Sequence, residues 1–144
     1  MNFIIQGGNA DLLKTCFCAV HWNLDLLKSG VVDLVHDEII NETAYDEYEI
    51  VIPTLVAGMT TQNKFDIPIR VDLQWAPERW GQTKSLNCDT CEGKGKIFPY
   101  SELEMTEFLF NREWKIIEEK GIKECPSCHG KGYEISKIRK ELEA

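Results

Sequence analysis

The residues best suited to chemistry are four cysteines in two nearly identical stretches, CDTCEGKGK at 88–96 and CPSCHGKGY at 125–133. Two residues between thiolates allow one tight turn to present both sulfurs to a tetrahedral ion, and two such turns complete a four-cysteine shell. The glycines permit positive φ, so the chain can fold back with amide groups facing the sulfurs. We predict a closed, structural zinc site rather than two separate redox pairs, and its ligands are Cys88, Cys91, Cys125 and Cys128.

The other two cysteines, Cys16 and Cys18, lie in a segment with helical periodicity. Positions i and i+2 of a helix point about 200° apart, so these thiols are not expected to share a metal. We predict that both are buried as small apolar side chains. His21 and His129 are interpreted as residues that bind no metal.

A second group of chemically competent residues is the trio His36-Asp37-Glu38 within VVDLVHDEII at 31–40. The flanking residues are mostly β-branched, which predicts two short strands joined by a tight turn at the trio. A carboxylate at such a hairpin tip is aimed out of the sheet, and divalent hard cations prefer carboxylate oxygens. Taken alone, the trio fits a solvated hairpin tip as well as a metal site.

The elements that must position the hairpin are helices predicted over 8–29 and 44–60 and a strand over 67–73. Pro53 is expected to kink or split the second helix. Asn9 is the expected N-cap of the first helix, and Ser29–Gly30 is expected to end it. Thr43 or Asn41 is the expected N-cap of the second helix. This order of elements indicates an α+β fold, an antiparallel sheet backed by helices.

The second half of the chain has its own pattern of elements around the cysteines. Ser101 and Glu104 form a capping box that begins a helix between the two stretches, and Gly121 ends it. A last amphipathic helix is predicted over 133–143. We therefore divide the chain into residues 1–84 and a zinc-binding module with helices over residues 85–144.

The composition excludes several classes of protein. A formal net charge of −8 argues against a wholly electrostatic nucleic-acid binder. No run approaches the ~18 apolar residues of a membrane helix. The N-terminal MNFIIQGGNADLL has no basic segment and no cleavable apolar stretch, so we expect a cytoplasmic protein, in the host cytoplasm if a phage encodes it.

The first half resembles the palm of family A (DNA polymerase I-like) DNA polymerases. QGGNADLLK at 6–14 is similar to that family's Q-G-x-x-A-D-hydrophobic-hydrophobic-K segment, and LVHDEI at 34–39 to its V-H-D-E motif. IPIRVD at 67–72 resembles the family's V-P-L-x-V-D strand, and Trp80-Gly81 follows. The order and spacing of all four agree, which implies a partial polymerase palm over residues 1–84.

The resemblance implies a role for each of four residues. Asp37 would bind a catalytic magnesium ion, and Glu38 would be an accessory carboxylate near the primer terminus. His36 would contact the primer-terminal backbone. Gln6 would hydrogen-bond the minor-groove edge of the terminal base pair, where the acceptors are similar for all pairs.

Two parts of a family A active site have no counterpart in this sequence. These are the second metal-binding aspartate and the fingers helix that grips the incoming nucleotide. We therefore expect the chain to be inactive alone, as the C-terminal fragment of a split polymerase of phage origin. An N-terminal polymerase fragment would complete the site on primer-template DNA and deoxynucleoside triphosphate.

Residues 88–132 resemble DnaJ-type zinc modules and the zinc-bearing segment of lambdoid phage antitermination proteins. This leaves open a non-enzymatic regulator whose zinc module binds nucleic acid or RNA polymerase. A His-Asp phosphohydrolase using His21 is disfavoured because His36-Asp37 lies in a strand-rich segment. A DnaJ-like chaperone is disfavoured because the cysteines build only one site and no J-domain is present.

The zinc module itself has three candidate roles. It would dock the partner fragment, bind another replication protein, or contact DNA through its basic residues. Those residues are Lys94, Lys96, Lys131, Lys137, Arg139 and Lys140. The modest local charge favours docking.

Overall fold

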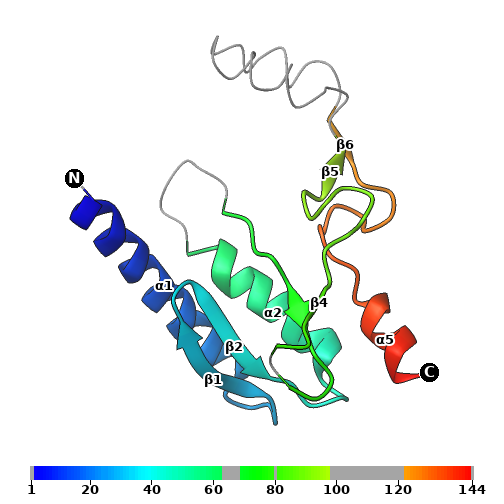
Figure 1. Ribbon diagram of the computed structural model, residues 1–144, viewed down its shortest axis with the longest axis horizontal. Coiled ribbons are helices and arrows are strands. Elements are labelled where there is room, and N and C mark those ends of the chain that lie inside the picture. Colours follow the sequence, from blue (N-terminus) through cyan, green and yellow to red (C-terminus); the bar gives the residue numbers. More distant parts are fainter. Residues whose placement is uncertain (1, 63–68, 80, 98–121, 144) are drawn as a thin grey trace. The chain divides into compact units, whose positions relative to one another are not determined.

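The computed structural model describes residues 2–62, 69–79, 81–97 and 122–143, with the backbone alone for residues 2–6. The chain forms two compact units, Met1–Val71 and Asp72–Ala144, which are described separately (Figure 1). The domains 1–84 and 85–144 are a division by motif rather than by contacts, and they stay a prediction. Within the described ranges, no helix is both long and apolar enough to cross a membrane.

The first unit contains α1 (Asn2–Leu24), the antiparallel hairpin of β1 (Gly30–Val35) and β2 (Glu38–Glu42), and α2 (Tyr48–Thr60). Helix α1 packs against α2 and β1, and the hairpin lies along the helices (Figure 1). The predicted α+β class is confirmed. The identity of this layer as a polymerase palm is taken up with the site.

A small apolar core joins the two helices to the hairpin. Its fully buried members are Val20, Leu24 and Val51. The partly buried residues packed against them are Leu27, Val31, Ile39, Leu55 and Met59. The helices approach so closely that a Cβ on Gly58 would lie 2.6 Å from Cγ2 of Val20. Residue 58 therefore has no room for a side chain.

Helix α1 begins and ends earlier than the sequence predicts, so Asn9 is not its N-cap and Ser29–Gly30 does not end it. The two glycines at 7 and 8 lower helix propensity by about 1 kcal/mol each but do not forbid a helix. The helix ends at Leu24 because the amides of Lys28 and Ser29 donate to the carboxylate of Glu47, at 3.0 and 2.9 Å. A tertiary contact thus decides this boundary.

The two cysteines of α1 differ in environment, so the prediction that both are buried is wrong for Cys18. Cys16 is 3% exposed and its thiol donates to the carbonyl of Met59 at 3.4 Å. Burial raises the pKa of the Cys16 thiol. Cys18 is exposed, because position i+2 points away from the face that Cys16 turns to the core.

Helix α2 begins at Tyr48 rather than near residue 44. Glu47 occupies its N-cap position, while Thr43 donates its hydroxyl to the side chain of Asn41 at 2.7 Å. Pro53 lies inside the helix and does not split it. Proline removes only one hydrogen bond here, and the neighbouring Val51 and Ile52 are buried and hold the helix against the core.

The second unit is built from short elements. Strand β3 (Gln74–Trp75) pairs with β4 (Lys84–Ser85), β5 (Lys96–Ile97) pairs with β6 (Lys123–Glu124), and α5 (Ser136–Leu142) follows. The interior residues outside the cysteines are Leu73, Leu86 and Ile138, all buried. The predicted helix that begins at the Ser101–Glu104 capping box and ends at Gly121 lies outside the described residues.

Asn87 explains two differences from the sequence prediction. The strand expected over 67–73 is absent from 69–73, because the amide of Leu73 donates to the Asn87 side chain at 3.3 Å. Residues 67–68 lie outside the described part of the chain. The last helix begins at Ser136 rather than 133, because Tyr133 forms a β-bridge with Asn87 and the amide of Glu134 donates to Leu86.

Candidate functional site

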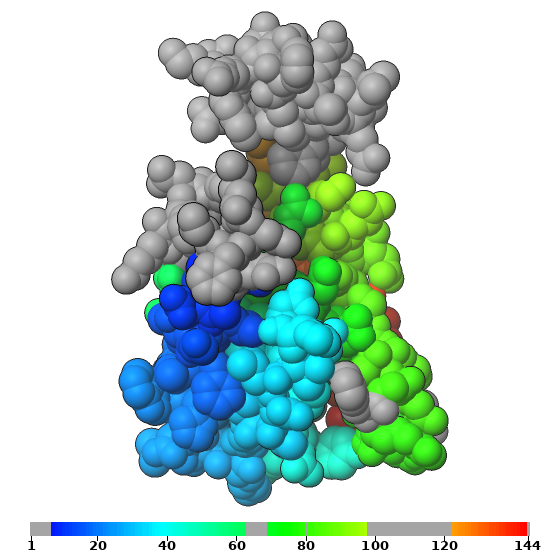
Figure 2. Space-filling model, turned by 60° about the vertical axis from the view of Figure 1, so that its left-hand side comes forward, coloured from blue at the N-terminus to red at the C-terminus, as the bar shows by residue number. Residues whose placement is uncertain are grey.

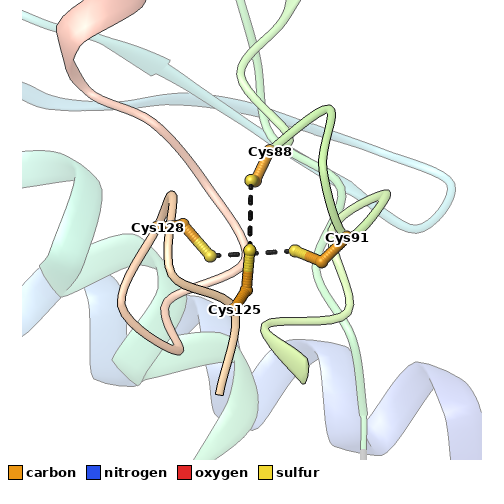
Figure 3. Close-up of side chains that lie close together, drawn as sticks. All are labelled: Cys88, Cys91, Cys125 and Cys128. Atoms are coloured by element: carbon orange, nitrogen blue, oxygen red, sulfur yellow. Dashed lines mark hydrogen bonds between the residues drawn. The ribbon is translucent and has the colours of Figure 1, made fainter. Parts of the chain in front are cut away.

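The four cysteines of the duplicated motif converge in the second unit. Their sulfur atoms lie within 4.8 Å of one another, and all four residues are buried. Figure 3 shows the four side chains pointing toward a common centre. The Sγ atoms of Cys88 and Cys125 are 3.8 Å apart, and those of Cys91 and Cys128 are 3.7 Å apart. A tetrahedron of sulfurs about 2.3 Å from a zinc ion has edges of about 3.8 Å, so this donor set fits a metal such as zinc.

Each cysteine pair belongs to a knuckle, the first over residues 88–95 and the second over 125–132. In the first knuckle the amide of Gly95 donates to Cys91 Sγ at 3.2 Å. In the second the amide of Gly132 donates to Cys128 Sγ, also at 3.2 Å. Glu92 and His129, the matching residues after each pair, both have φ of +51°. The two knuckles therefore repeat one backbone conformation, with amides aimed at the sulfurs.

The knuckles also hold each other through reciprocal backbone contacts. The amide of Cys125 donates to the carbonyl of Gly95 at 2.9 Å, and the amide of Cys88 donates to that of Gly132 at 2.8 Å. A Cβ on either glycine would collide with a carbonyl oxygen of the opposite knuckle. The glycines are required here both by their positive φ and by this close approach.

Burial and backbone amides act in opposite directions on the thiols of the cluster. Burial raises the pKa of Cys88 to about 12 and also raises the pKa of Cys91. The amide of Cys128 lowers the pKa of Cys125 to about 7, because it stabilises the thiolate. Four thiolates at this separation require a cation, so metal binding would release the remaining protons. His21 and His129 are both exposed and take no part in the cluster.

The second candidate site is the tip of the β1–β2 hairpin, where the predicted turn is confirmed. Val35 pairs with Glu38, and His36-Asp37 form the two-residue turn between them. His36, Asp37 and Glu38 are all exposed, and the hairpin forms part of the surface of its unit (Figure 2). His36 has φ of +56°, which costs a non-glycine residue about 1–2 kcal/mol.

The register of the hairpin decides which side chains share the tip. Val35 pairs with Glu38, so these two side chains share a face, and Asp33 lies on the same face because it is two residues before Val35. Ile39, the neighbour of Glu38, lies on the other face. Ile39 packs on the helix core. The carboxylates of Asp33 and Glu38 therefore belong to the face of the hairpin away from the helices. Gln6 lies near the start of α1, on a different element.

A pair of residues at the opposite end of the hairpin was not predicted from the sequence. Ser29, only 4% exposed, donates its hydroxyl to Glu47 Oε2 at 2.7 Å and accepts the amide of Ala44 at 2.9 Å. The Ser29 hydroxyl, and after it the amide of Lys28, lowers the pKa of Glu47. Lys28 and Asp46 form an ion pair beside them. Of these residues, only Ser29 was singled out from the sequence, as part of the expected end of the first helix.

With this geometry in view, comparison with known proteins defines the class of the first half. The family model for DNA polymerase family A matches residues 1–82, which is more than half of the chain. The chain therefore belongs to DNA polymerase family A. The match contains the whole β1–β2 hairpin and ends before the first metal-site cysteine.

Individual relatives agree with the family assignment. DNA polymerase I of Caldicellulosiruptor bescii is 33% identical over 86 residues, which are 58% of this chain and 10% of that polymerase. DNA polymerase I of Aquifex aeolicus is 36% identical over 87 residues, 56% of this chain and 15% of that polymerase. The chain thus spans a small part of the relatives it matches. No solved structure matches it.

Proposed function

We propose that this chain supplies the C-terminal part of a family A polymerase palm, as one piece of a split polymerase of phage origin. The observation that supports this most directly is the position of Asp37, exposed in the turn of a regular hairpin inside the family-matched segment. In this proposal an N-terminal polymerase fragment holds the fingers and the other palm aspartate. The assembled pair acts on primer-template DNA and deoxynucleoside triphosphates in the cytoplasm of the host.

The residues of the hairpin have distinct proposed roles. Asp37 holds magnesium together with the partner chain, and Glu38 acts as an accessory carboxylate near the primer terminus. When bound, magnesium ions bring the attacking 3′-oxygen and the triphosphate together and stabilise the developing charge. His36 contacts the primer-terminal backbone. Gln6 hydrogen-bonds the minor-groove edge of the terminal base pair.

The need for a partner follows from the chemistry. A two-metal site needs carboxylates on both sides of the ions, and in this proposal the β1–β2 turn supplies them on one side only. The chain alone is proposed to be inactive.

Cys88, Cys91, Cys125 and Cys128 are proposed to bind structural zinc. An all-cysteine shell leaves no open position for a substrate, which argues for a structural role. The module would then serve as a docking element for the partner chain, with DNA contact by its lysines as a lesser role. In support, two of its lysines already pair with acids of the module, Lys94 with Glu92 and Lys137 with Asp89.

The test is magnesium-dependent primer extension by material that co-purifies with the tagged full chain from its native host. Asp37→Asn is expected to lower extension by at least about 1,000-fold, because a catalytic metal loses a charged ligand. Asp25→Asn makes the same chemical change at an exposed position after α1 and is the matched control. Wild-type extension by the Asp37→Asn complex would rule the proposal out.

A second candidate function is a non-enzymatic regulator whose zinc module binds nucleic acid or RNA polymerase. It is favoured by one observation, that the four-cysteine cluster lies outside the residues matched to the polymerase family. This function predicts that Asp37→Asn has no effect and that Cys125→Ser abolishes binding. Recovery of RNA polymerase without extension activity would select it.

A further inference from the structure

We propose that Ser29 and Glu47 are positioning residues that fix the direction of the β1–β2 hairpin and thereby the location of Asp37. The contacts between them, with the amides of Lys28 and Ala44, are called the Ser29–Glu47 bracket. The effect of the bracket on synthesis rests on the proposed function. Its effect on the hairpin does not.

The bracket gathers three segments at one end of the hairpin. Ser29 immediately precedes β1, Ala44 follows β2, and Glu47 is the N-cap residue of α2. The Ser29 hydroxyl donates to Glu47 and accepts from the Ala44 amide, so it ties both strand ends together. The Glu47 carboxylate also accepts the amides of residues 28 and 29. The base of the hairpin is therefore fastened to the start of α2.

The carboxylate of Glu47 bonds to the base of the hairpin and not to its own helix. An N-cap side chain ordinarily accepts an amide of the first turn of its own helix. Glu47 makes no such bond, and its carboxylate is directed to Ser29 and Lys28 instead. The carbonyl of Glu47 still accepts the amides of Ile50 and Val51, so the helix start stays intact.

Leverage makes the base of the hairpin important for its tip. The strands between base and turn extend about 15 Å, at about 3.3 Å per residue. A rotation of about 4° at the base would therefore move Asp37 by about 1 Å, and misplacement of that size can cost about 100-fold in rate. The hairpin is two strands wide in the described residues, so apart from the bracket it is held by the packing of Val31 and Ile39 on the helix core.

The first experiment measures amide hydrogen exchange in the full chain without any partner. Ser29→Ala and Glu47→Gln are compared with Thr54→Ala, which removes an exposed hydroxyl bond within α2. Both bracket variants are expected to speed exchange of the β1 and β2 amides by at least about 10-fold, while amides around Val20 and Val51 stay within about 3-fold. If one bracket variant fails to fold, the other still decides the result.

The second experiment measures steady-state primer extension by the assembled polymerase. Ser29→Ala is expected to lower kcat by about 10- to 100-fold and to raise the magnesium concentration for half-maximal rate. The KM for nucleotide is expected to change by less than about 3-fold, because the bracket lies at the opposite end of the hairpin from the turn. Thr54→Ala should leave all three quantities unchanged.

The two proposals fail in distinguishable ways. Hairpin amides that exchange at the wild-type rate in Ser29→Ala and Glu47→Gln would overturn the bracket. An unchanged kcat in Ser29→Ala, in a complex that Asp37→Asn inactivates, would overturn its role in synthesis while leaving the proposed function standing. Full activity of Asp37→Asn would overturn the proposed function, and hydrogen exchange would still judge the bracket.

Discussion

The amide of Cys125 donates a 2.9 Å hydrogen bond to the carbonyl of Gly95, a residue of the other knuckle. The amide of Cys88 makes the matching bond to Gly132. Each knuckle thus donates one backbone hydrogen bond to the other and accepts one from it. The amide of the first cysteine in each knuckle finds its acceptor only in the other knuckle, so metal binding and the folding of this region are expected to be coupled.

The first prediction concerns removal of the metal. The chain should bind one zinc ion, and a strong chelator should unfold the region around the cysteines, because such sites contribute ~10–16 kcal/mol of apparent binding energy. Metal analysis and amide exchange check this. Cys125→Ser should lose the zinc, whereas Cys18→Ser, at an exposed cysteine of α1, should keep it. A chelated chain with unchanged exchange at residues 88–97 would contradict the prediction.

The second prediction separates backbone strain from steric collision at the knuckle glycines. Gly132→Ala places a Cβ against the carbonyl of Gly93 at a φ of +83°. Gly81→Ala is the matched control, since Gly81 has φ of +102° and nothing within 4 Å of an added Cβ. The control should cost about 1–2 kcal/mol of unfolding free energy from strain alone.

Gly132→Ala should cost more than this and should also weaken zinc binding by at least about 10-fold, because the Gly132 amide donates to Cys128 Sγ. Competition with a chromogenic chelator measures the affinity. Equal effects of the two substitutions would show that the close approach of the knuckles contributes nothing.

Local signals predicted the parts of this protein that local sequence decides. The cysteine cluster follows from a duplicated spacing with duplicated glycines, and the hairpin follows from β-branched residues around His36-Asp37. Boundaries set by distant partners were missed. Glu47 binds the amide of Ser29 across 18 residues, and Asn87 binds the amide of Leu73 across 14. No short-range pattern announces either bond.

The third prediction tests the close packing of α1 on α2. Gly58→Ala should destabilise the chain by about 1–3 kcal/mol, because its Cβ would lie 2.6 Å from Cγ2 of buried Val20. Gly8→Ala is the matched control, since Gly8 is also helical and has nothing within 4 Å of an added Cβ. That substitution should stabilise by about 0.5–1 kcal/mol through helix propensity. Urea unfolding of both variants measures the difference, and a stabilised Gly58→Ala would disprove the packing argument.

The fourth prediction concerns the acid sensitivity of the Ser29–Glu47 bracket. The pKa of Glu47 is lowered in the folded chain, chiefly by the Ser29 hydroxyl, so the ionised carboxylate favours folding. Its contribution is complete above the unfolded glutamate pKa of about 4.3 and is lost as the pH falls toward the lower folded value. Asp46, whose pKa the Lys28 ammonium lowers, adds a loss of the same sign.

Urea unfolding of the wild type and Glu47→Gln at a series of pH values between 7 and 3 checks this. The glutamine variant should be less stable than the wild type at neutral pH. Its amide has one acceptor oxygen in place of two, and it lacks the negative charge that strengthens the three hydrogen bonds. The two proteins should converge in stability as the pH falls, since the wild-type carboxyl gains a proton and loses the same advantage. A constant difference across the whole pH series would mean that the bracket depends on shape and not on the charge of Glu47.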